Sequence, residues 1–282
     1  MAAASAVSGG ASIVILSDRG VNAEKAPIPA LLATAAVHHH LIRLGIRTQA
    51  GLVVETGEAR ESHHFCLLIG YGAGAVNPYV AFETLADLHR EGFFPAELSL
   101  EQSKKNYIKA ANKSIVKVAS KMGISTVQSY RGAQIFEAIG LGKDVIDRYF
   151  TKTASRIGGI NLEVIAAESL ERHRTGFPPI RVNGQTLANG GTYQWRRDGE
   201  YHMWNPETVA KMQHAVRVES YKTFKEYTKL CNDEASHRCT IRGLLNFKPT
   251  GAPIPIDQVE SAKDIVKRFV TGAMSLGSIS TE

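Results

Sequence analysis

Cysteine is scarce in this chain, whose 282 residues contain only Cys66, Cys231 and Cys239. The number is odd, and no two of them have the C-x-x-C spacing of zinc sites and redox motifs. We therefore expect neither a disulfide framework nor a metal site, and the composition suits a reducing compartment.

Long apolar runs are missing as well. No stretch reaches the roughly 20 apolar residues that a membrane-spanning helix needs. The first ten residues lack the basic segment and the apolar core of a signal peptide. The sequence therefore predicts no membrane partner and no secretory leader.

The positive charge is spread out rather than concentrated. The net charge is +6, and the lysines between positions 104 and 121 recur at helical spacing without aromatic residues among them. Proteins that bind single-stranded nucleic acid interleave such charges with stacking side chains. We expect a solvated helix face and no nucleic-acid partner.

What the chain does have is an alternation of short apolar runs and helical patterns. Hydrophobic residues make up 44% of the sequence, enough for a substantial core. The periodicity predicts strands at 12–18, 49–55 and 124–128, and helices at 30–44, 62–69, 82–89, 100–122 and from 132 to 138. The short apolar run at 12–18 is typical of a buried parallel strand. This order predicts an α/β fold with parallel strands, either a β/α half-barrel or a doubly wound sheet.

Changes in amino-acid composition divide the chain into three regions. Residues 1–172 form the β/α region, and residues 173–256 a loop-rich and helical connector. In the connector we expect loops and a small hairpin over 173–205, a helical face over 206–231, and an extended proline-rich linker at 248–255.

The last region, 257–282, reads as a helix to Val270 followed by an apolar strand with small residues. That is how the first strand of a TIM-type barrel begins. We expect the chain to be part of a larger protein, because one barrel strand needs its partners.

A glycine-rich run from Gly70 to Gly74 has two interpretations. It could cradle a phosphate of a nucleotide, or support a protein partner, in a free-standing binding module. Its spacing matches neither the dinucleotide fingerprint nor the P-loop. Close packing of the backbone is the simpler reading, since glycine lets chain segments approach.

Histidines form two clusters, at 38–40 and at 63–64. Adjacent helical residues point about 100° apart, so three in a row cannot bind one metal ion. We expect at least one to be buried and hydrogen-bonded. A less favoured alternative is an acid/base site of His38 with Arg43, or of His63 with His64, in a complete small enzyme.

Two polar segments follow predicted strands, where α/β folds place ligand-binding loops. The first contains Glu55 and Glu58. Its charges could bind a ligand or merely cap the next helix, with Glu61 and Ser62 as the capping residues. The second contains Ser129, Arg131 and Gln134, which could line a path or hold a neighbouring domain. No nucleophile elbow or paired carboxylates accompany them, so no self-contained catalytic site is predicted.

Several long runs, taken in order, resemble the large subunit of the glutamate synthase family over essentially the whole chain. They are the runs ILSDR (15–19), PIPALLA (27–33), VHHHLI (37–42), GLVVETGEAR (51–60), IGYGAGAVNPY (69–79), MGISTVQSYRGAQ (122–134) and TGAMSLGS (271–278). The resemblance covers the latter part of the central domain and the threshold of the flavin-bearing synthase domain.

The resemblance implies an enzyme that makes L-glutamate from L-glutamine and 2-oxoglutarate. An amidotransferase domain would release ammonia, which travels through a tunnel to a synthase domain carrying FMN and a 3Fe–4S cluster. Electrons would come from an NAD(P)H-linked subunit or from ferredoxin, in bacterial cytoplasm or plastid stroma. The central domain would join the two catalytic domains and help to wall the tunnel.

The resemblance also assigns residues. Met274, Ser275, Gly277 and Ser278 would lie near the flavin or 2-oxoglutarate, whereas Ser129, Arg131, Gln134, Glu55 and Glu58 would face the tunnel or the domain interface. The glutaminase cysteine and the cysteines of the cluster are not in this sequence. The chain alone is expected to bind no cofactor and to be inactive.

Overall fold

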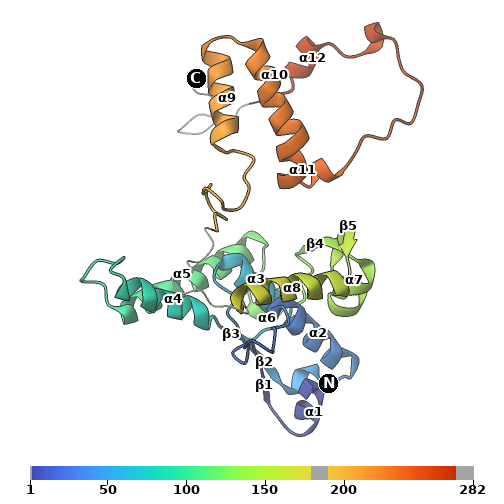
Figure 1. Cartoon of the computed structure of the whole chain (residues 1–282). Helices are drawn as coiled ribbons and strands as arrows, with labels where there is room; N and C mark the ends of the chain where they lie inside the picture. Colours follow the sequence, from blue (N-terminus) through green and yellow to red (C-terminus); the bar gives the residue numbers. More distant parts are fainter. Residues whose placement is uncertain (1, 179–189, 271–282) are drawn as a thin grey trace. The chain divides into compact units, whose positions relative to one another are not determined.

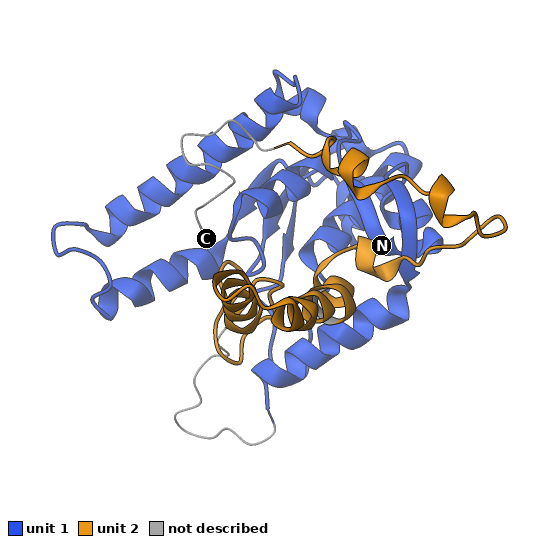
Figure 2. Ribbon diagram, turned by 90° about the horizontal axis from the view of Figure 1, so that it is seen from above, with its two compact units in different colours: residues 1–181 blue, residues 182–282 orange. Residues whose placement is uncertain are grey.

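The computed structural model describes residues 2–178 and 190–270. The chain divides into two compact units, residues 1–181 and 182–282 (Figures 1 and 2). The expected barrel strand with Met274, Ser275, Gly277 and Ser278 lies outside the described residues.

The first unit is a mixed α/β structure. Its strands are β1 (Ile13–Ser17), β2 (Gly51–Glu55), β3 (Ala75–Asn77), β4 (Glu137–Leu141) and β5 (Ala154–Ile160). Its helices are α1 (Ala2–Ser8), α2 (Ala30–Arg43), α3 (Ser62–Gly70), α4 (Tyr79–Arg90), α5 (Leu100–Lys121), α6 (Val127–Tyr130), α7 (Lys143–Tyr149) and α8 (Leu162–Gly176), with a 3₁₀ turn at Arg47–Gln49.

The strands form two small sheets, both parallel. The larger has the order β1-β2-β3, with Ile15 opposite Val53 and Ser17 opposite Glu55. Strands β4 and β5 pair in a second sheet with shifts of register. The prediction of an α/β fold with parallel strands is therefore confirmed for the described strands.

Strand β1 was expected to be buried, and this is wrong for one of its faces. Val14 is buried, but Ile13 and Ile15 are 62% and 61% exposed. Alternate residues of a strand point to opposite faces, and helices α1 and α2 contact this strand. An apolar run therefore predicted the strand correctly without showing that only one face would be covered.

Helix α2 is the centre of the first unit, because it contributes to three apolar clusters. Ala30 packs with Val54, Phe65 and Leu68 of β2 and α3. Leu41 packs with Leu52 and Val14, and Ala35 with Val145 of α7. These side chains hold α2 against both the sheet and the later part of the chain.

The region after α5 differs from the sequence prediction. The expected strand at 124–128 is instead the short helix α6, because the Thr126 hydroxyl accepts a hydrogen bond from the backbone N–H of Ser129 at 3.2 Å and caps it. The expected helix at 132–138 is a loop leading into β4. Gly132 and Gln134 have φ of 71° and 55°, which a right-handed helix cannot include.

The regular elements described in the second unit are all helical. Helices α9 (Pro206–Arg217) and α10 (Tyr221–Lys229) pack together and share the 2.8 Å ion pair Lys211–Glu226. A π-helical turn (Leu230–Ala235), α11 (Ser236–Cys239), 3₁₀ turns (Arg242–Leu244 and Ile256–Gln258) and α12 (Ala262–Val266) follow.

Three predictions for this region can be compared with the structure. The linker at 248–255 has no helix or strand, as predicted. The helix expected from 257 to 270 is limited to α12, which the Ser261 hydroxyl caps. Residues 190–205, the described end of the expected hairpin region, contain no strand.

Within residues 2–178 and 190–270, no helix is both long enough and apolar enough to cross a membrane.

Candidate functional site

The carboxyl ends of β1, β2 and β3 carry a polar network centred on Glu55. Its carboxylate accepts hydrogen bonds from the Ser17 hydroxyl at 2.6 Å, from Arg19 Nε at 2.7 Å and from Asn77 Nδ2 at 3.1 Å. These bonds lower the pKa of Glu55, the Ser17 bond most strongly. The Arg19 guanidinium also lies 4.0 Å from the Tyr79 ring centroid. Glu55 is thus held as an anion at the edge where parallel sheets bind ligands or partners.

Glu58, the second predicted carboxylate of this edge, caps a helix. Its Oε2 accepts a 2.8 Å hydrogen bond from the backbone N–H of Ala30, the first residue of α2. A negative charge is favourable at this position because of the helix dipole. The segment therefore does cap a helix, but through Glu58 and at α2. The capping of the next helix, α3, by Glu61 or Ser62 is wrong, since the N-cap residue Glu61 makes no side-chain cap hydrogen bond to that helix.

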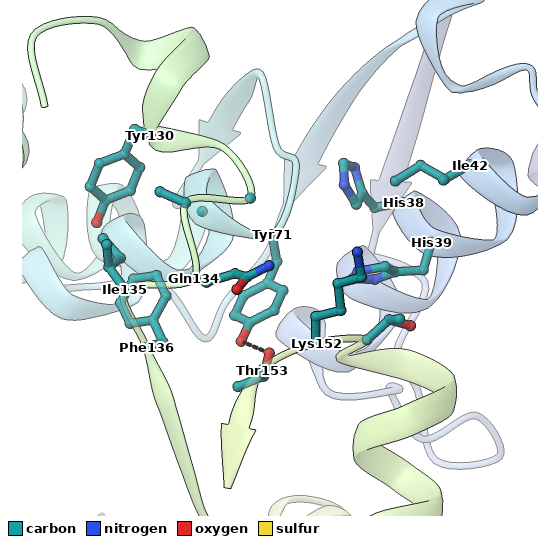
Figure 3. Close-up of a pocket in the computed structure, with 14 residues that line it drawn as sticks. His38, His39, Ile42, Tyr71, Tyr130, Gln134, Ile135, Phe136, Lys152 and Thr153 are labelled. Atoms are coloured by element: carbon teal, nitrogen blue, oxygen red, sulfur yellow. Dashed lines mark hydrogen bonds between the residues drawn. The ribbon is translucent and has the colours of Figure 1, made fainter.

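The predicted residues Gln134 and His38 meet at a pocket of about 270 Å³ (Figure 3). Helix α2, the end of α3, the loop after α6 and the segment before β5 surround it. Its side chains are apolar or aromatic and polar in equal number, with no Asp or Glu: Ile42, Tyr71, Tyr130, Ala133, Ile135 and Phe136, and His38, His39, Gln134, Thr151, Lys152 and Thr153.

Aromatic side chains form one wall of this pocket. The rings of Tyr71 and Phe136 stack with centroids 5.9 Å apart, and Tyr130 meets Phe136 edge-on at 6.4 Å. The Tyr71 and Thr153 hydroxyls share a 2.6 Å hydrogen bond. Burial raises the pKa of Tyr71, so the phenol stays neutral.

Hydrogen bonds define the tautomers of the two histidines. Arg47 Nε donates to His38 Nδ1 at 2.9 Å, so the proton of the neutral His38 ring is on Nε2. The His39 Nδ1 is 2.9 Å from the Ala35 carbonyl and donates to it. Both rings are half-buried, and His38 pairs with Arg47 rather than with Arg43, which donates to the Arg148 carbonyl. The predicted His38–Arg43 acid/base pair is therefore wrong.

His38 should make the first unit sensitive to mild acid. Burial, and next the nearby charge of Arg47, lower its pKa from 6.5 to about 4 in the folded chain. Between these values the unfolded chain binds more protons, so stability falls as the pH drops from 6.5 to 4 and the contribution levels off below. We expect His38 to account for about 1–2 kcal/mol of this loss, discounted for the ring's partial exposure.

The measurement is hydrogen exchange of residues 30–80 at several pH values. In the His38→Gln variant the loss between pH 6.5 and 4 should shrink, while His40→Gln, a substitution two residues away, keeps it. Carboxylates whose pKa is lowered by folding, such as Glu55, also lose stability as the pH falls, so the difference between the variants is the quantity to compare. Equal pH profiles for His38→Gln and the unmodified chain would contradict the assignment.

The other two residues of the predicted polar segment lie apart from the pocket lining. Ser129 is exposed and belongs to the capped first turn of α6. Arg131 is half-buried near Gly74, and its Nε is enclosed without a hydrogen-bond partner among the described residues. The structure thus brings together only Gln134 of this trio with the pocket.

The glycine-rich run has no free amides to cradle a phosphate. The N–H groups of Gly72 and Ala73 donate to Ile69 and Leu68, and that of Gly74 donates to Leu52 at 2.7 Å. Gly72 has φ of 114° and lies against His38, and Gly70 lies against Phe136. The packing interpretation is therefore correct, and the nucleotide-binding alternative receives no support.

The second histidine pair, His63 and His64, does not form a site, because the two rings have different neighbours. His63 meets the Phe136 ring edge-on, whereas His64 Nδ1 is 3.3 Å from the backbone N–H of Arg60. Among the residues that the structure describes, no three His, Cys, Asp or Glu side chains gather as a metal site would require.

Sequence reasoning missed Arg47, Tyr71 and Lys152, which complete the arrangement around His38. Arg47 precedes a predicted strand, and nothing in its neighbourhood signals a contact with α2. Tyr71 lies within the glycine run, where a large side chain between two glycines was the available signal. Lys152 is brought to the pocket by the chain reversal between α7 and β5, with φ of 66°.

Together the described residues define an α/β protein with small parallel sheets, a polar network at the strand ends and one aromatic-walled pocket. Two family models match the sequence. The glutamate synthase central domain matches residues 1–142, and the conserved region in glutamate synthase matches residues 202–282.

Curated relatives have the same family name. The chain is 50% identical over 277 residues to the glutamate synthase [NADPH] large chain of Bacillus subtilis, covering 98% of this chain and 18% of that one. It is 44% identical to the glutamate synthase [NADH] of Schizosaccharomyces pombe, covering 98% and 13%. The ferredoxin-dependent glutamate synthase 1 of Arabidopsis thaliana is 42% identical, with 100% and 18% covered.

The chain belongs to the glutamate synthase family. It spans less than a fifth of the length of these curated relatives.

Proposed function

We propose that this chain is part of a glutamate synthase large subunit that makes L-glutamate from L-glutamine and 2-oxoglutarate. The observation that carries the proposal is the 50% identity over 98% of the chain to a relative of that name. Relatives named for NADPH, NADH and ferredoxin are all similar over nearly the whole chain, so its role is common to enzymes with different electron donors.

Within the parent, this chain would couple an amidotransferase domain to a synthase domain. Ammonia equilibrates with water and becomes protonated, so a sheltered route between the two domains preserves the neutral nucleophile. Residues 1–172 would be a half-barrel-like β/α element, residues 173–256 a connector, and residues 257–282 would begin the synthase barrel. The parent would act in bacterial cytoplasm or in the plastid stroma, and some relatives are named chloroplastic.

FMN and the 3Fe–4S cluster belong to the proposed parent. The described residues do not fit either group, since they include no cluster of metal ligands and no free amides in the glycine-rich run. The proposed flavin neighbours Met274, Ser275, Gly277 and Ser278 are outside the described residues. No step of the reaction is therefore derived through these groups from the present residues.

The proposed contribution of this chain rests on its polar edges. Glu55 and Glu58 lie at and just beyond the end of β2, and Ser129, Arg131 and Gln134 lie in and after α6. Arg131 is half-buried beside Gly74, where its side chain joins the loop after α6 to the glycine-rich run. We propose that these residues face the ammonia route or the domain interface.

The test uses the full-length parent polypeptide with its electron donor. The rates of glutamine hydrolysis and of 2-oxoglutarate consumption are measured together, for the unmodified enzyme and for Arg131→Met. We expect the variant to hydrolyse about twofold or more glutamine per 2-oxoglutarate consumed, because a displaced interface lets ammonia escape.

Arg90→Met is the matched control, since Arg90 is exposed on α4 and forms an ion pair with Asp87 of the same helix. This control should leave the ratio unchanged. A parent that consumes no 2-oxoglutarate would contradict the enzymatic assignment, whereas an Arg131→Met enzyme with an unchanged ratio would contradict only the coupling role.

A further inference from the structure

The pocket beside His38 combines features of a binding site, and of its lining residues only Gln134 enters the proposed function. One wall is aromatic, the volume of about 270 Å³ holds several heavy atoms, and the polar groups converge from segments far apart in the sequence. Cavities that bind small molecules typically have an apolar lining with a few placed polar groups. The pocket therefore has the shape and composition of a small-molecule site.

The pocket lining carries a positive charge and no negative one. Lys152 lines the pocket, and no Asp or Glu does. Arg47 stands directly behind His38, bonded to its Nδ1, and adds further positive potential on that side. Since Arg47 fixes the proton of the neutral His38 ring on Nε2, His38 has an N–H donor that has no partner among the described residues. These groups favour an anion.

The backbone of the pocket lining has an unfavourable conformation at two residues. The described residues include four non-glycine residues with positive φ, and two of them, Gln134 at 55° and Lys152 at 66°, line this pocket. Such conformations cost free energy and persist where the surroundings enforce them, frequently at ligand sites. Figure 3 shows both side chains directed into the space that faces the two histidines.

The inner wall supplies a flat apolar surface. Tyr71 and Phe136 stack there, and the Tyr130 side chain, 2% exposed, lies beside them. Burial, and next the neighbouring Cys66 thiol, raise the pKa of the Tyr130 hydroxyl, so it stays neutral. A planar ring would fit against these side chains, leaving its charged end toward Lys152.

We propose that this pocket binds a small aromatic carboxylate, with the ring against Tyr71 and Phe136 and the carboxylate toward Lys152, Gln134 and His38. The inference concerns the 282-residue chain itself and does not depend on the reaction of the parent. Charge-assisted hydrogen bonds are the stronger ones, so the carboxylate should contribute much of the affinity.

The experiment is a calorimetric and ligand-observed NMR titration of the chain with phenylacetate, 2-phenylethanol and phenethylamine. The three probes share a ring and differ in the charge of the side group. We expect saturable binding of phenylacetate, and binding about tenfold or more weaker for the alcohol and the amine. Equal affinities, or no binding of phenylacetate, would overturn the proposal.

The variant Lys152→Gly removes the charge without adding backbone strain, because glycine accepts positive φ. It should keep the fold, gain or retain thermal stability, and bind phenylacetate about tenfold or more weakly. Glu219→Gly is the matched control, since Glu219 has φ of 53° and belongs to the other unit. A Lys152→Gly chain with unchanged affinity would overturn the assigned carboxylate position, and weakened binding in both variants would overturn the specificity of the site.

Discussion

The Gly72→Ala variant should lose about 3–5 kcal/mol of stability in the first unit, the largest effect that we expect from one methyl group. Gly72 has φ of 114°, which residues with a side chain rarely adopt. A Cβ at this position would overlap the His38 ring at Nδ1. That atom accepts the hydrogen bond of Arg47, so the ring cannot turn aside without breaking it.

The stability measurement for Gly72→Ala must report on the first unit, which contains Gly72. Both tryptophans, Trp195 and Trp204, belong to the second unit, so tryptophan fluorescence reports on that unit alone. We expect the loss in hydrogen exchange of peptides from residues 30–80, with an unchanged fluorescence transition.

Gly45→Ala is the control for backbone strain alone. Gly45 also has positive φ, 71°, but no atom lies within 4 Å of the position of its Cβ. It should cost about 1 kcal/mol, the usual penalty of a left-handed non-glycine residue. Equal losses for the two variants would show that His38 does not confine the methyl group.

The same glycine illustrates what could be predicted from the sequence. Alternating apolar runs and helical periodicity predicted β1, β2 and helices α2 to α5 within a few residues, because local patterns encode these elements. The glycine run could be interpreted only as close packing. The partner in that packing, His38, is 34 residues earlier, and no local signal connects the two.

The failure at 124–138 has a local cause. The β-branched residues Ile124 and Val127 are typical of a strand, and they led to the prediction of one. Thr126, which lies between them, instead caps the helix α6. Residues 137–141 become a strand because β5, more than ten residues later, pairs with them. Pairing of distant segments outweighs local propensity, which is weak for strands.

The pocket was only partly predictable for a related reason. His38 and Gln134 are conspicuous in the sequence as a histidine run and a polar segment. Their meeting depends on α2 packing against both the sheet and α7 through Leu41 and Ala35. Lys152 joins them only through the turn before β5, so the cationic group of the site could not be identified beforehand.

Arg47→Met should lower the stability of the first unit by about 2–4 kcal/mol. Its guanidinium donates to His38 Nδ1 at 2.9 Å, to the Ala50 carbonyl at 2.7 Å and to the Gly72 carbonyl at 2.8 Å. One side chain thereby joins α2, the entry of β2 and the glycine run. Methionine keeps the apolar stem but leaves these acceptors without their donor.

Arg43→Met is the matched control, since Arg43 is exposed and, among the described residues, donates one 3.2 Å hydrogen bond, to the Arg148 carbonyl. It should cost less than about 1 kcal/mol. Both variants are compared by hydrogen exchange of residues 30–80 at pH 7. A loss for Arg47→Met no larger than for Arg43→Met would contradict the central role of Arg47.

Arg47→Met should also change the pH response of His38, which a purely structural loss would not do. Burial is the first cause of the low His38 pKa and the Arg47 charge the second, so removing Arg47 should raise that pKa from about 4 without restoring 6.5. The acid-dependent part of the stability loss should then shrink. In the double variant His38→Gln/Arg47→Met, the two effects should be non-additive, because the residues are in direct contact. Additive losses would mean that Arg47 stabilises the two carbonyls independently of the ring, and the proposed mutual support of Arg47, His38 and Gly72 would be wrong.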